Sequence, residues 1–359
     1  MYHATLWGVV NPQNLQTEAF IEYGTSTEYG SEKPARQNPV SGADPVNIEV
    51  FLDGLLPNTQ YHYRVKMVNS LGTTYGEDKS FHTIPEPPII SQYRPSKRTS
   101  SSVVLNGEID PKGLDISLYV DYGTDPNSLT TFGPVYFSGT DILPVEITLN
   151  NLESNKLYFY HFRAVYLLGE TYLNNDFFFT KGGLVDVDGN QYSTMEFGGK
   201  EWMVDNLKTS HYNDGSPISN LPEYSQWDNT LSGAFCWYDN DSVRYHELYG
   251  KLYNWNAVYT GKLCPTGWHV PSETEWLTMV CDPMLECNCG SLLYFPNYLG
   301  GRRLTESYFI DMDNEGHWWS TTNSPEGMNR YFFSFGPCFS AIYEYSSSHL
   351  GQSIRCVKD

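Results

Sequence analysis

The sequence is poor in basic residues and has no cysteine in its first 235 positions. It holds 22 Lys and Arg against 42 Asp and Glu, which gives a formal net charge of −20. A field of this sign repels phosphate backbones and argues against nucleic-acid binding. No apolar run approaches the roughly 18 residues that a membrane-spanning helix requires, so we expect no transmembrane segment.

A secretory leader is also missing from the start of the sequence. Residues 1–8 have the pattern of a first β-strand rather than that of a signal peptide. We therefore expect one of two cases. Either the protein is exported, secreted or lipid-anchored, through a leader missing from this sequence, or it leaves its cell without one, as a virion component does.

Aromatic residues are abundant, with 28 Tyr, 18 Phe and 9 Trp. Together with many turn residues, they favour β structure and aromatic contact surfaces. The seven cysteines all lie from position 236 onward, and an odd number leaves at least one free thiol or an intermolecular bond. Zinc is an alternative for Cys287 and Cys289, but their one-residue spacing is unusual and no histidine pair follows.

An internal repeat runs through the first half of the chain. Three segments recur about one hundred residues later: Gly8–Pro12 as Gly107–Pro111, Phe20–Thr25 as Leu118–Thr124, and Tyr61–Val65 as Tyr160–Ala164. This period is the size of one β-sandwich. Within each copy, alternating apolar and polar residues between Asn, Pro and Gly turns predict short strands.

The two copies resemble the fibronectin type III family. In that family a Leu-x-Pro-x-x-x-Tyr corner precedes a Tyr-x-Tyr-x-Val strand, and Leu55–Val65 contains both. The resemblance implies that the hydroxyl of Tyr61 caps a backbone group at the corner. The second copy, Asn151–Tyr158, lacks the proline. We place the two domains at residues 1–84 and 85–181, joined by a stiff Pro-rich linker, and expect them to act as spacers.

From Val185 onward, Trp and Cys become frequent, and several motifs follow one another: Gly198–Leu207, Tyr249–Trp255, Leu263–Pro271, His317–Thr322 and Gly351–Val357. Together they resemble the Fibrobacter succinogenes major paralogous domain over residues 184–359. That family is related to the formylglycine-generating-enzyme group and has a C-type-lectin-like fold. Its members occur mostly in Bacteroidetes and Fibrobacteres, commonly as exported or lipid-anchored surface proteins. Ser272, followed by acidic residues, predicts the start of a helix.

The resemblance also implies a disulfide between Cys264 and Cys356, because the elements that carry them are neighbours in this fold. Two buried thiols are the alternative. For the other cysteines the sequence settles no pairing.

These resemblances imply a mostly β, multidomain protein: two Ig-like or fibronectin type III β-sandwiches followed by an α+β C-type-lectin-like domain. We expect no enzyme. The formylglycine-generating enzymes use redox-active cysteines near the chain end, and no counterpart of that pair is evident here. The sequence also has no Gly-x-Ser-x-Gly nucleophile elbow and no phosphate-binding glycine loop.

No cofactor or metal is expected either. Many C-type lectins bind sugar through calcium, but Trp318-Trp319-Ser320 stands where their Trp-Asn-Asp strand would fall. Residues 311–316 imitate the start of a calcium loop, yet the twelfth position is Thr322 rather than a bidentate Glu. A solvated acidic turn is the simpler interpretation, and Asp186–Asn190 is likewise predicted to be a turn.

A ligand-binding face is predicted near the C-terminus, where aromatic residues alternate in a β-hairpin. A mixture of aromatic residues with Ser and Gly is typical of adaptable contact surfaces and of sugar-stacking platforms. A hairpin that buries one aromatic face in the core is the alternative. The candidate residues are Trp318, Trp319, Tyr331, Phe333, Phe335, Phe339, Tyr343, Tyr345 and His349.

The sequence therefore predicts a surface-exposed adhesion protein whose sandwiches present a C-terminal domain to a glycan or a protein receptor at a cell surface. One alternative is a receptor-binding protein displayed on a phage or diversified by a retroelement, with variation confined to residues 318–349. Another is a structural surface or fimbrial subunit that binds no small ligand.

Overall fold

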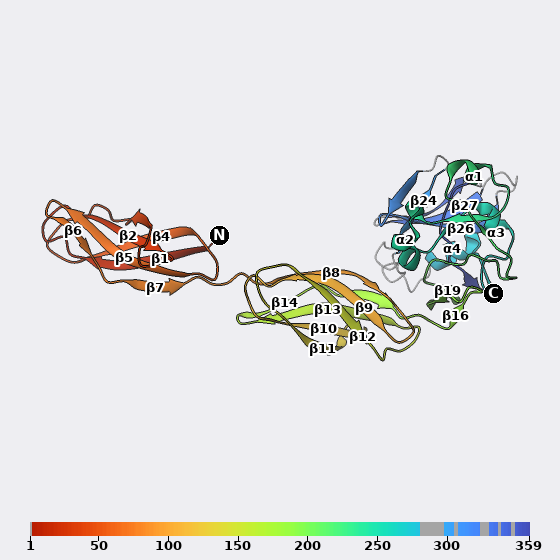
Figure 1. Ribbon diagram of the computed structural model, residues 1–359, viewed down its shortest axis with the longest axis horizontal. Coiled ribbons are helices and arrows are strands. Elements are labelled where there is room, and N and C mark those ends of the chain that lie inside the picture. The colour runs from red at the N-terminus through yellow and green to blue at the C-terminus, as the bar shows by residue number, and fades with distance from the viewer. Residues whose placement is uncertain (1, 281–297, 305–307, 324–329, 337–338, 346–348) are drawn as a thin grey trace.

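The computed structural model describes residues 2–280, 298–304, 308–323, 330–336, 339–345 and 349–359. The protein is mostly β, as predicted, and its units follow one another in a row (Figure 1). A short extended segment, Ile84–Pro88, connects the first two units. Among the described strands, no sheet combines strands from both sides of residue 84 or of residue 182. The domain boundaries themselves stay predictions. No helix among the described residues is long and apolar enough to cross a membrane.

The first unit is a sandwich of two antiparallel sheets. Its strands are β1 (Tyr2–Val10), β2 (Glu18–Gly24), β3 (Ser31–Pro34), β4 (Val46–Leu55), β5 (Gln60–Asn69), β6 (Gly72–Tyr75) and β7 (Lys79–His82). One sheet contains only β1 and β4, and the other has the order β3-β2-β5-β6 with β7 also paired to β5. Alternation places Ile48, Val50 and Leu52 of β4 in the core between the sheets.

The second unit repeats this arrangement with one more strand. Its strands are β8 (Ile89–Ser96), β9 (Val103–Asp110), β10 (Ile116–Asp125), β11 (Ser128–Phe137), β12 (Leu143–Leu149), β13 (Leu157–Tyr166), β14 (Gly169–Tyr172) and β15 (Asp176–Phe179). One sheet has the order β12-β9-β8, and the other β11-β10-β13-β14 with β15 also paired to β13.

Both sandwiches contain the tyrosine corner. The hydroxyl of Tyr61 accepts from the backbone N–H of Leu56 at 3.0 Å, and that of Tyr158 accepts from Glu153 at 3.0 Å. Tyr61 therefore corresponds to Tyr158, and the sequence pairing of Tyr61 with Tyr160 is wrong by two residues. Aromatic residues recur at every second position in both strands. An alignment of the two strands that is shifted by two residues therefore still matches aromatic with aromatic residues.

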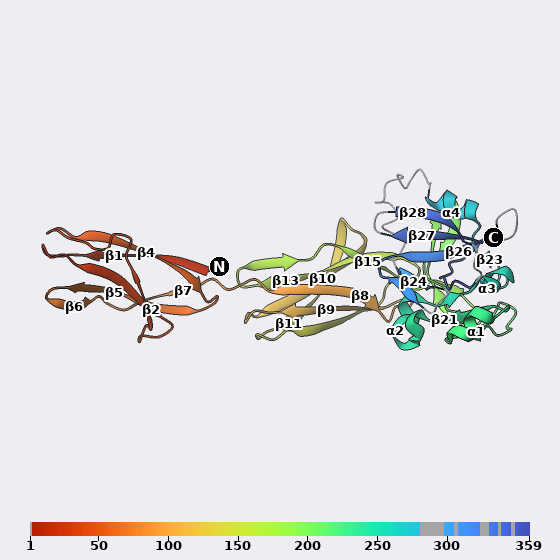
Figure 2. The ribbon, with the colours of Figure 1, turned by 90° about the horizontal axis from the view of Figure 1, so that it is seen from above.

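In its described residues, the third unit, called the C-terminal unit below, mixes short strands with four α-helices. Its elements are β16 (Leu184–Val185), β17 (Gln191–Tyr192), β18 (Thr194–Phe197), β19 (Lys200–Met203), β20 (Ser219–Asn220), α1 (Tyr224–Asn229), β21 (Ala234–Cys236), α2 (Ser242–Tyr249), β22 (Leu252–Tyr253), α3 (Trp255–Tyr259), β23 (Trp268–His269), α4 (Glu273–Val280), β24 (Gly300–Arg303), β25 (Phe309–Met312), β26 (Gly316–Asn323), β27 (Arg330–Gly336), β28 (Phe339–Tyr345) and β29 (Val357–Lys358). The largest sheet has the order β25-β24-β26-β27-β28 (Figure 2).

The predicted helix start at Ser272 is confirmed. The hydroxyl of Ser272 accepts from the backbone N–H of Glu275 at 3.3 Å, while the Glu275 carboxylate accepts from the Ser272 N–H at 2.8 Å. This reciprocal capping box satisfies amides that the first turn of α4 leaves without helical partners.

The predicted disulfide between Cys264 and Cys356 is also present, and it links the segment before α4 to the last strands. Cys236 is buried and forms no disulfide, and burial raises the pKa of its thiol to about 11. It is therefore a protonated, inert thiol at neutral pH. Cys281, Cys287, Cys289 and Cys338, with the zinc alternative, lie outside the described residues.

A buried ion pair joins the second sandwich to the C-terminal unit. Arg98, in the turn after β8, lies 2.6 Å from a carboxylate oxygen of Asp205, and their side chains are only 2% and 3% exposed. Lys181 lies 3.3 Å from the other carboxylate oxygen. The Arg98 guanidinium also donates to the carbonyl of Phe179 and packs on the ring of Tyr298.

The surroundings of this ion pair stabilise its charges. Burial by itself would raise the pKa of Asp205, but Arg98 and Lys181 hold that pKa well below its usual value. Hydrogen bonds continue the contact, since Ser193 donates to the carbonyl of Thr180 at 2.8 Å. The second sandwich and the C-terminal unit therefore meet in a packed, desolvated joint, whereas an extended linker separates the first sandwich from the second.

Replacing Arg98 by alanine should destabilise the joint by about 3–5 kcal/mol, because Asp205 would be left buried without its main partner. Urea unfolding followed by tryptophan fluorescence tests this, since Trp7 is the only tryptophan outside residues 184–359. Arg94→Ala is the matched control. Arg94 pairs with Asp313 at the same joint, but their side chains are 39% and 51% exposed, so the loss should stay below about 1 kcal/mol. Equal losses in both variants would contradict this account of the joint.

The disulfide should contribute about 4 kcal/mol to the stability of the C-terminal unit, because the bonded residues are 92 positions apart. We expect the Cys264→Ala/Cys356→Ala variant to unfold at lower urea by that amount. Reductant should lower the stability of the unmodified protein and leave that of the variant unchanged. A variant as stable as the unmodified protein would show that the bond contributes nothing.

Candidate ligand-binding surface

Four of the aromatic residues predicted to bind a ligand lie in the core. Trp318, Trp319, Phe333 and Phe335 are 1%, 0%, 1% and 8% exposed. The indole N–H of Trp318 donates to Asn206 Oδ1 at 2.9 Å, and that of Trp319 donates to the carbonyl of Tyr253 at 2.7 Å. These four side chains have no surface to offer a ligand, so for them the prediction is corrected and the core alternative holds.

The reason is that β26 and β27 lie inside a sheet covered on both faces. Trp318 and Phe333 belong to one apolar cluster, with the Phe333 ring stacked on Trp276 at 4.8 Å between centroids. Trp319 and Phe332, their neighbours in sequence, belong to another cluster. Consecutive strand residues point to opposite faces. The adjacent pairs Trp318-Trp319 and Phe332-Phe333 were therefore the sequence signal for a strand buried on both sides.

The remaining predicted residues are either partly exposed to solvent or lie outside the described part of the structure. Tyr331 and His349 are half-buried. The carbonyl of His349 accepts from the indole of Trp227, and its imidazole lies 3.8 Å from Asp228. The side chains of Phe339, Tyr343 and Tyr345 lie outside the described residues. Strand β28, which carries these three residues, lies at the end of the strand order β25-β24-β26-β27-β28. The predicted binding face is therefore limited to this edge of the sheet.

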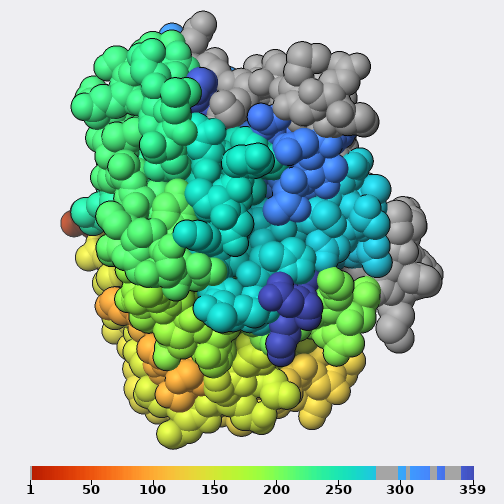
Figure 3. All heavy atoms as spheres, turned by 90° about the vertical axis from the view of Figure 1, so that its right-hand side faces the viewer, coloured from red at the N-terminus to blue at the C-terminus, as the bar shows by residue number. Residues whose placement is uncertain are grey.

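A polar groove of about 320 Å³ lies elsewhere on the C-terminal unit. It is lined by Leu184, Val185, Asp186, Val187, Thr209, His211, Asn213, Leu263, Cys264, Pro265 and Thr266. The C-terminal unit, coloured green to blue, forms the end face of the molecule above the second sandwich (Figure 3). The groove residues come from the segment that enters this unit and from the loop that carries the disulfide.

The turn predicted at Asp186–Asn190 is confirmed, and it positions a carboxylate beside the groove. Asp186 Oδ1 accepts from the backbone N–H groups of Asp188 and Asn190, both at 2.9 Å. The turn places Asp188 Oδ1 at 2.5 Å from Nδ1 of His211. Asp188 Oδ2 accepts from the N–H of Ser210 at 2.5 Å. Burial would raise the pKa of Asp188, but these hydrogen bonds lower it, so the group is a carboxylate.

His211 is the group of this pair that a ligand can reach, since its side chain is 42% exposed and lines the groove. With Nδ1 held by Asp188, the Nε2 atom is the one that can exchange a hydrogen bond with a ligand hydroxyl or carbonyl. Asp188 and His211 were not predicted as a pair from the sequence. They are 23 positions apart, and only the fold brings them together.

Lys251 supports the groove from inside. Its ammonium lies 4.0 Å from the ring centroid of Phe235 and 2.5 Å from the hydroxyl of Ser210. Burial lowers its pKa to about 8 against the opposing effect of Asp188 and Asp186. Lys251 therefore anchors the segment that carries Ser210 and His211. The groups that line the groove itself are the oriented imidazole of His211 and its polar neighbours.

One group of described residues has the composition of a metal site: Asp311, Glu315 and His317, whose ligand atoms lie within 4.8 Å of one another. His317 Nε2 lies 3.0 Å from Asp311 Oδ2, and its Nδ1 bonds to the hydroxyl of Ser334. Arg302 already lies 3.2 Å from the same Asp311 oxygen. Its guanidinium places a positive charge beside this carboxylate, although the Nε atom forms no hydrogen bond there.

The predicted acidic turn at residues 311–316 is present. The N–H groups of Asn314 and Glu315 donate to the carbonyl of Asp311, and the turn joins β25 to β26. However, Asp311 and Glu315 are half-buried rather than solvated, because they pack against His317.

Comparison with known proteins gives one family match. Residues 195–282, within the C-terminal unit, match the family model described as the Fibrobacter succinogenes major domain. A search of curated proteins finds no match.

Solved structures give weaker likenesses. The sensor domain of the anti-sigma factor RsgI4 from Pseudobacteroides cellulosolvens is 18% identical, with 27% of this chain and 97% of that one covered and a TM-score of 0.22. The FN1-FN3 domains of chicken CNTN1 are 14% identical, with 46% and 57% covered and a TM-score of 0.21. Scores this low carry no conclusion, so the family match of residues 195–282 is the finding that characterises this chain.

Proposed function

We propose that the protein is a non-catalytic binding protein exposed outside the cell, in which the C-terminal unit contacts a glycan or a protein receptor. The sandwiches serve as a spacer that holds this unit away from the surface that carries it. The observation that carries the proposal is the buried joint of Arg98, Asp205 and Lys181. It fixes the C-terminal unit to the end of the second sandwich, as the presentation of a binding domain requires.

Two properties support a location outside the cell. The Cys264–Cys356 disulfide is of a kind that persists in oxidising compartments. The family match at residues 195–282 supports the C-type-lectin-like fold, whose relatives are commonly exported. Secretion or display on a cell surface or a virion fits these properties equally.

Two surfaces of the C-terminal unit are suited to a ligand. The polar groove offers the imidazole of His211, oriented by Asp188, together with Thr209 and Asn213. Such groups exchange hydrogen bonds with the hydroxyls of a sugar. Strand β28, next to β27, carries Tyr343 and Tyr345 of the predicted aromatic face, and aromatic residues can stack against a sugar ring or a protein side chain. The groove is the stronger candidate, because its geometry is complete within the described residues.

A glycan array with the full chain should therefore reveal a ligand. Binding should persist in the presence of a chelator, because the contacts proposed here, His211 and its polar neighbours, require no metal. We expect His211→Ala to weaken binding by up to about tenfold, since one hydrogen bond is worth about 0.5–1.5 kcal/mol. Tyr343→Ala tests the edge strand in the same assay.

Tyr259→Ala is the control, because Tyr259 on α3 is 76% exposed and lines neither surface. It should bind like the unmodified protein. Binding that survives both His211→Ala and Tyr343→Ala would rule out both surfaces. Silence on every glycan, together with no binding to cell-surface protein extracts, would reject the binding function and favour a structural subunit.

A further inference from the structure

Three side chains at one end of the large sheet bring metal-ligating atoms together. Asp311 lies on β25, Glu315 in the turn that follows, and His317 on β26. The Nε2 atom of His317 lies 3.0 Å from Asp311 Oδ2 and 3.5 Å from Glu315 Oε2. In the sheet, β26 stands between β24 and β27 (Figure 2), so the group is fixed by regular structure on both sides.

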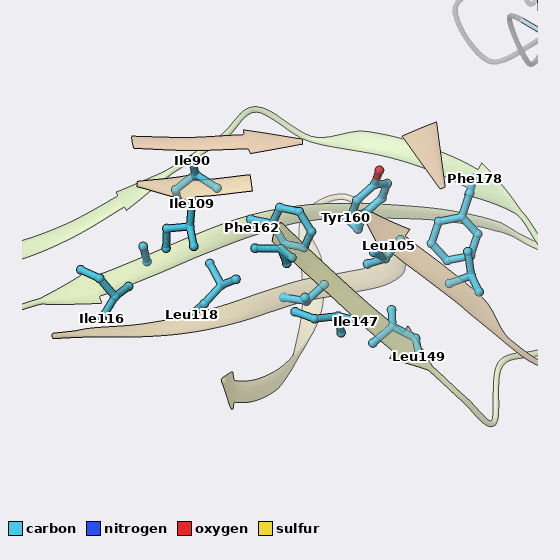
Figure 4. Close-up of a cluster of buried hydrophobic side chains, with 14 of the residues drawn as sticks. Ile90, Leu105, Ile109, Ile116, Leu118, Ile147, Leu149, Tyr160, Phe162 and Phe178 are labelled. Atoms are coloured by element: carbon cyan, nitrogen blue, oxygen red, sulfur yellow. The ribbon is translucent and has the colours of Figure 1, made fainter. Parts of the chain in front are cut away.

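His317 brings an ionisable ring into the interior of the C-terminal unit. Its side chain is only 2% exposed, and it faces two carboxylates. The core of the second sandwich is different, because its labelled side chains are hydrocarbon apart from the hydroxyl of Tyr160 (Figure 4). A buried imidazole beside two carboxylates has to be explained by the charges around it.

The imidazole of His317 is neutral at pH 7. Burial lowers its pKa to about 4, with the charge of Arg302 acting in the same direction and Asp311 opposing both. A neutral ring carries a single N–H. Its Nδ1 lies 2.6 Å from the hydroxyl of Ser334 on β27. Histidine ligands of metals usually make such a contact through the second ring nitrogen, because it fixes the tautomer and the orientation of the ring.

The neutral ring cannot compensate both carboxylates. With the N–H on Nδ1, the Nε2 lone pair faces two negative groups, and with the N–H on Nε2, the ring donates to only one of them. Within the described residues, His317 is the only basic side chain within 4.0 Å of the Glu315 carboxylate. Burial and the charge of Asp311 raise the pKa of Glu315. Either tautomer therefore leaves a carboxylate without a positive partner.

Arg302 on β24 balances only part of this charge. Its Nε atom lies 3.2 Å from Asp311 Oδ2 and forms no hydrogen bond there. One guanidinium against two carboxylates leaves an excess of one negative charge. A cation held between the three ligand atoms would remove this excess.

The distances between the ligand atoms favour a small ion that accepts imidazole. Zinc binds histidine nitrogen and carboxylate oxygen at about 2.0–2.2 Å in a tetrahedron, which places neighbouring ligand atoms about 3.3–3.6 Å apart. The 3.0 and 3.5 Å separations around His317 Nε2 are close to this range. Calcium prefers six to eight oxygen ligands at about 2.3–2.6 Å, and this group offers only two carboxylates and a nitrogen.

We propose that Asp311 Oδ2, Glu315 Oε2 and His317 Nε2 bind a zinc ion, with water in the fourth position. The two carboxylate side chains are 19% and 24% exposed, so an ion reaches them from solvent. The same turn carries Asp313, which pairs with Arg94 of the second sandwich at 2.8 Å. Zinc therefore also fixes a turn that contacts the neighbouring unit. The site is separate from the polar groove, and the inference does not depend on the ligand proposed there.

The test is isothermal titration calorimetry of the full chain with Zn²⁺, after removal of bound metal with a chelator. We expect saturable binding by the unmodified chain. Glu315→Gln keeps the size of the side chain and removes its charge, and Ser334→Ala removes the partner of Nδ1. Each should weaken zinc binding by about tenfold or more, because loss of a partner that orients a ligand alone costs about 10–100-fold in metal affinity.

Asp359→Asn is the matched control. Asp359 and Glu275 also flank a histidine, but they contact Nδ1 and Nε2 of His269 respectively, so they lie on opposite edges of the ring and cannot share one ion. Zinc binding by this variant should equal that of the unmodified chain. Far-UV circular dichroism establishes that each variant is folded.

Cysteine thiolates are alternative zinc ligands, and Cys287 and Cys289 lie outside the described residues. The Cys287→Ser/Cys289→Ser variant should bind zinc as the unmodified chain does. Co²⁺ in place of zinc gives a second measurement that needs no substitution at the site. Its visible absorption should be that of a tetrahedral complex, without the charge-transfer band that thiolate ligands produce.

The proposal is overturned if the unmodified chain binds no zinc, or if Glu315→Gln binds it as tightly as the unmodified chain does. Loss of binding in Cys287→Ser/Cys289→Ser, or a thiolate band in the cobalt spectrum, would place the ion on cysteines and equally reject this site. The cobalt spectrum decides the question if Glu315→Gln does not fold.

Discussion

The buried contact of Arg98 with Asp205 is the interaction on which the arrangement of the molecule depends. A carboxylate that is 3% exposed is tolerable only with opposite charge beside it, and Arg98 and Lys181 come from the second sandwich while Asp205 belongs to the C-terminal unit. Neither unit can satisfy these groups alone. The contact therefore makes one body of two units that the sequence presents as separate, and it determines which surfaces of the C-terminal unit are left for a ligand.

Burial on both faces of the large sheet decides which of its side chains reach the surface. The aromatic residues of β26 and β27 belong to two apolar clusters, one on each face of the sheet. They therefore stabilise the fold of the C-terminal unit and are not exposed for contacts with other molecules. Diversification across residues 318–349 could not freely include Trp318, Trp319, Phe333 or Phe335, because substitution there would leave cavities in the core. Exposed polar groups lie instead where the Asp186–Asn190 turn contacts the segment that carries His211.

The sequence by itself determined the elements that depend on local patterns: the mostly β class, the repeated sandwiches, the tyrosine corner at Tyr61, the capped helix after Ser272 and the acidic turn at residues 311–316. The Cys264–Cys356 bond was predictable from resemblance to a known family. Only the tertiary structure decided what depends on long-range contacts. It paired Asp188 with His211, joined Arg98 to Asp205 and buried Trp318 and Trp319. Alternating residue types along a strand indicate that its two faces differ. Which of the faces is buried depends on packing against segments that are distant in the sequence.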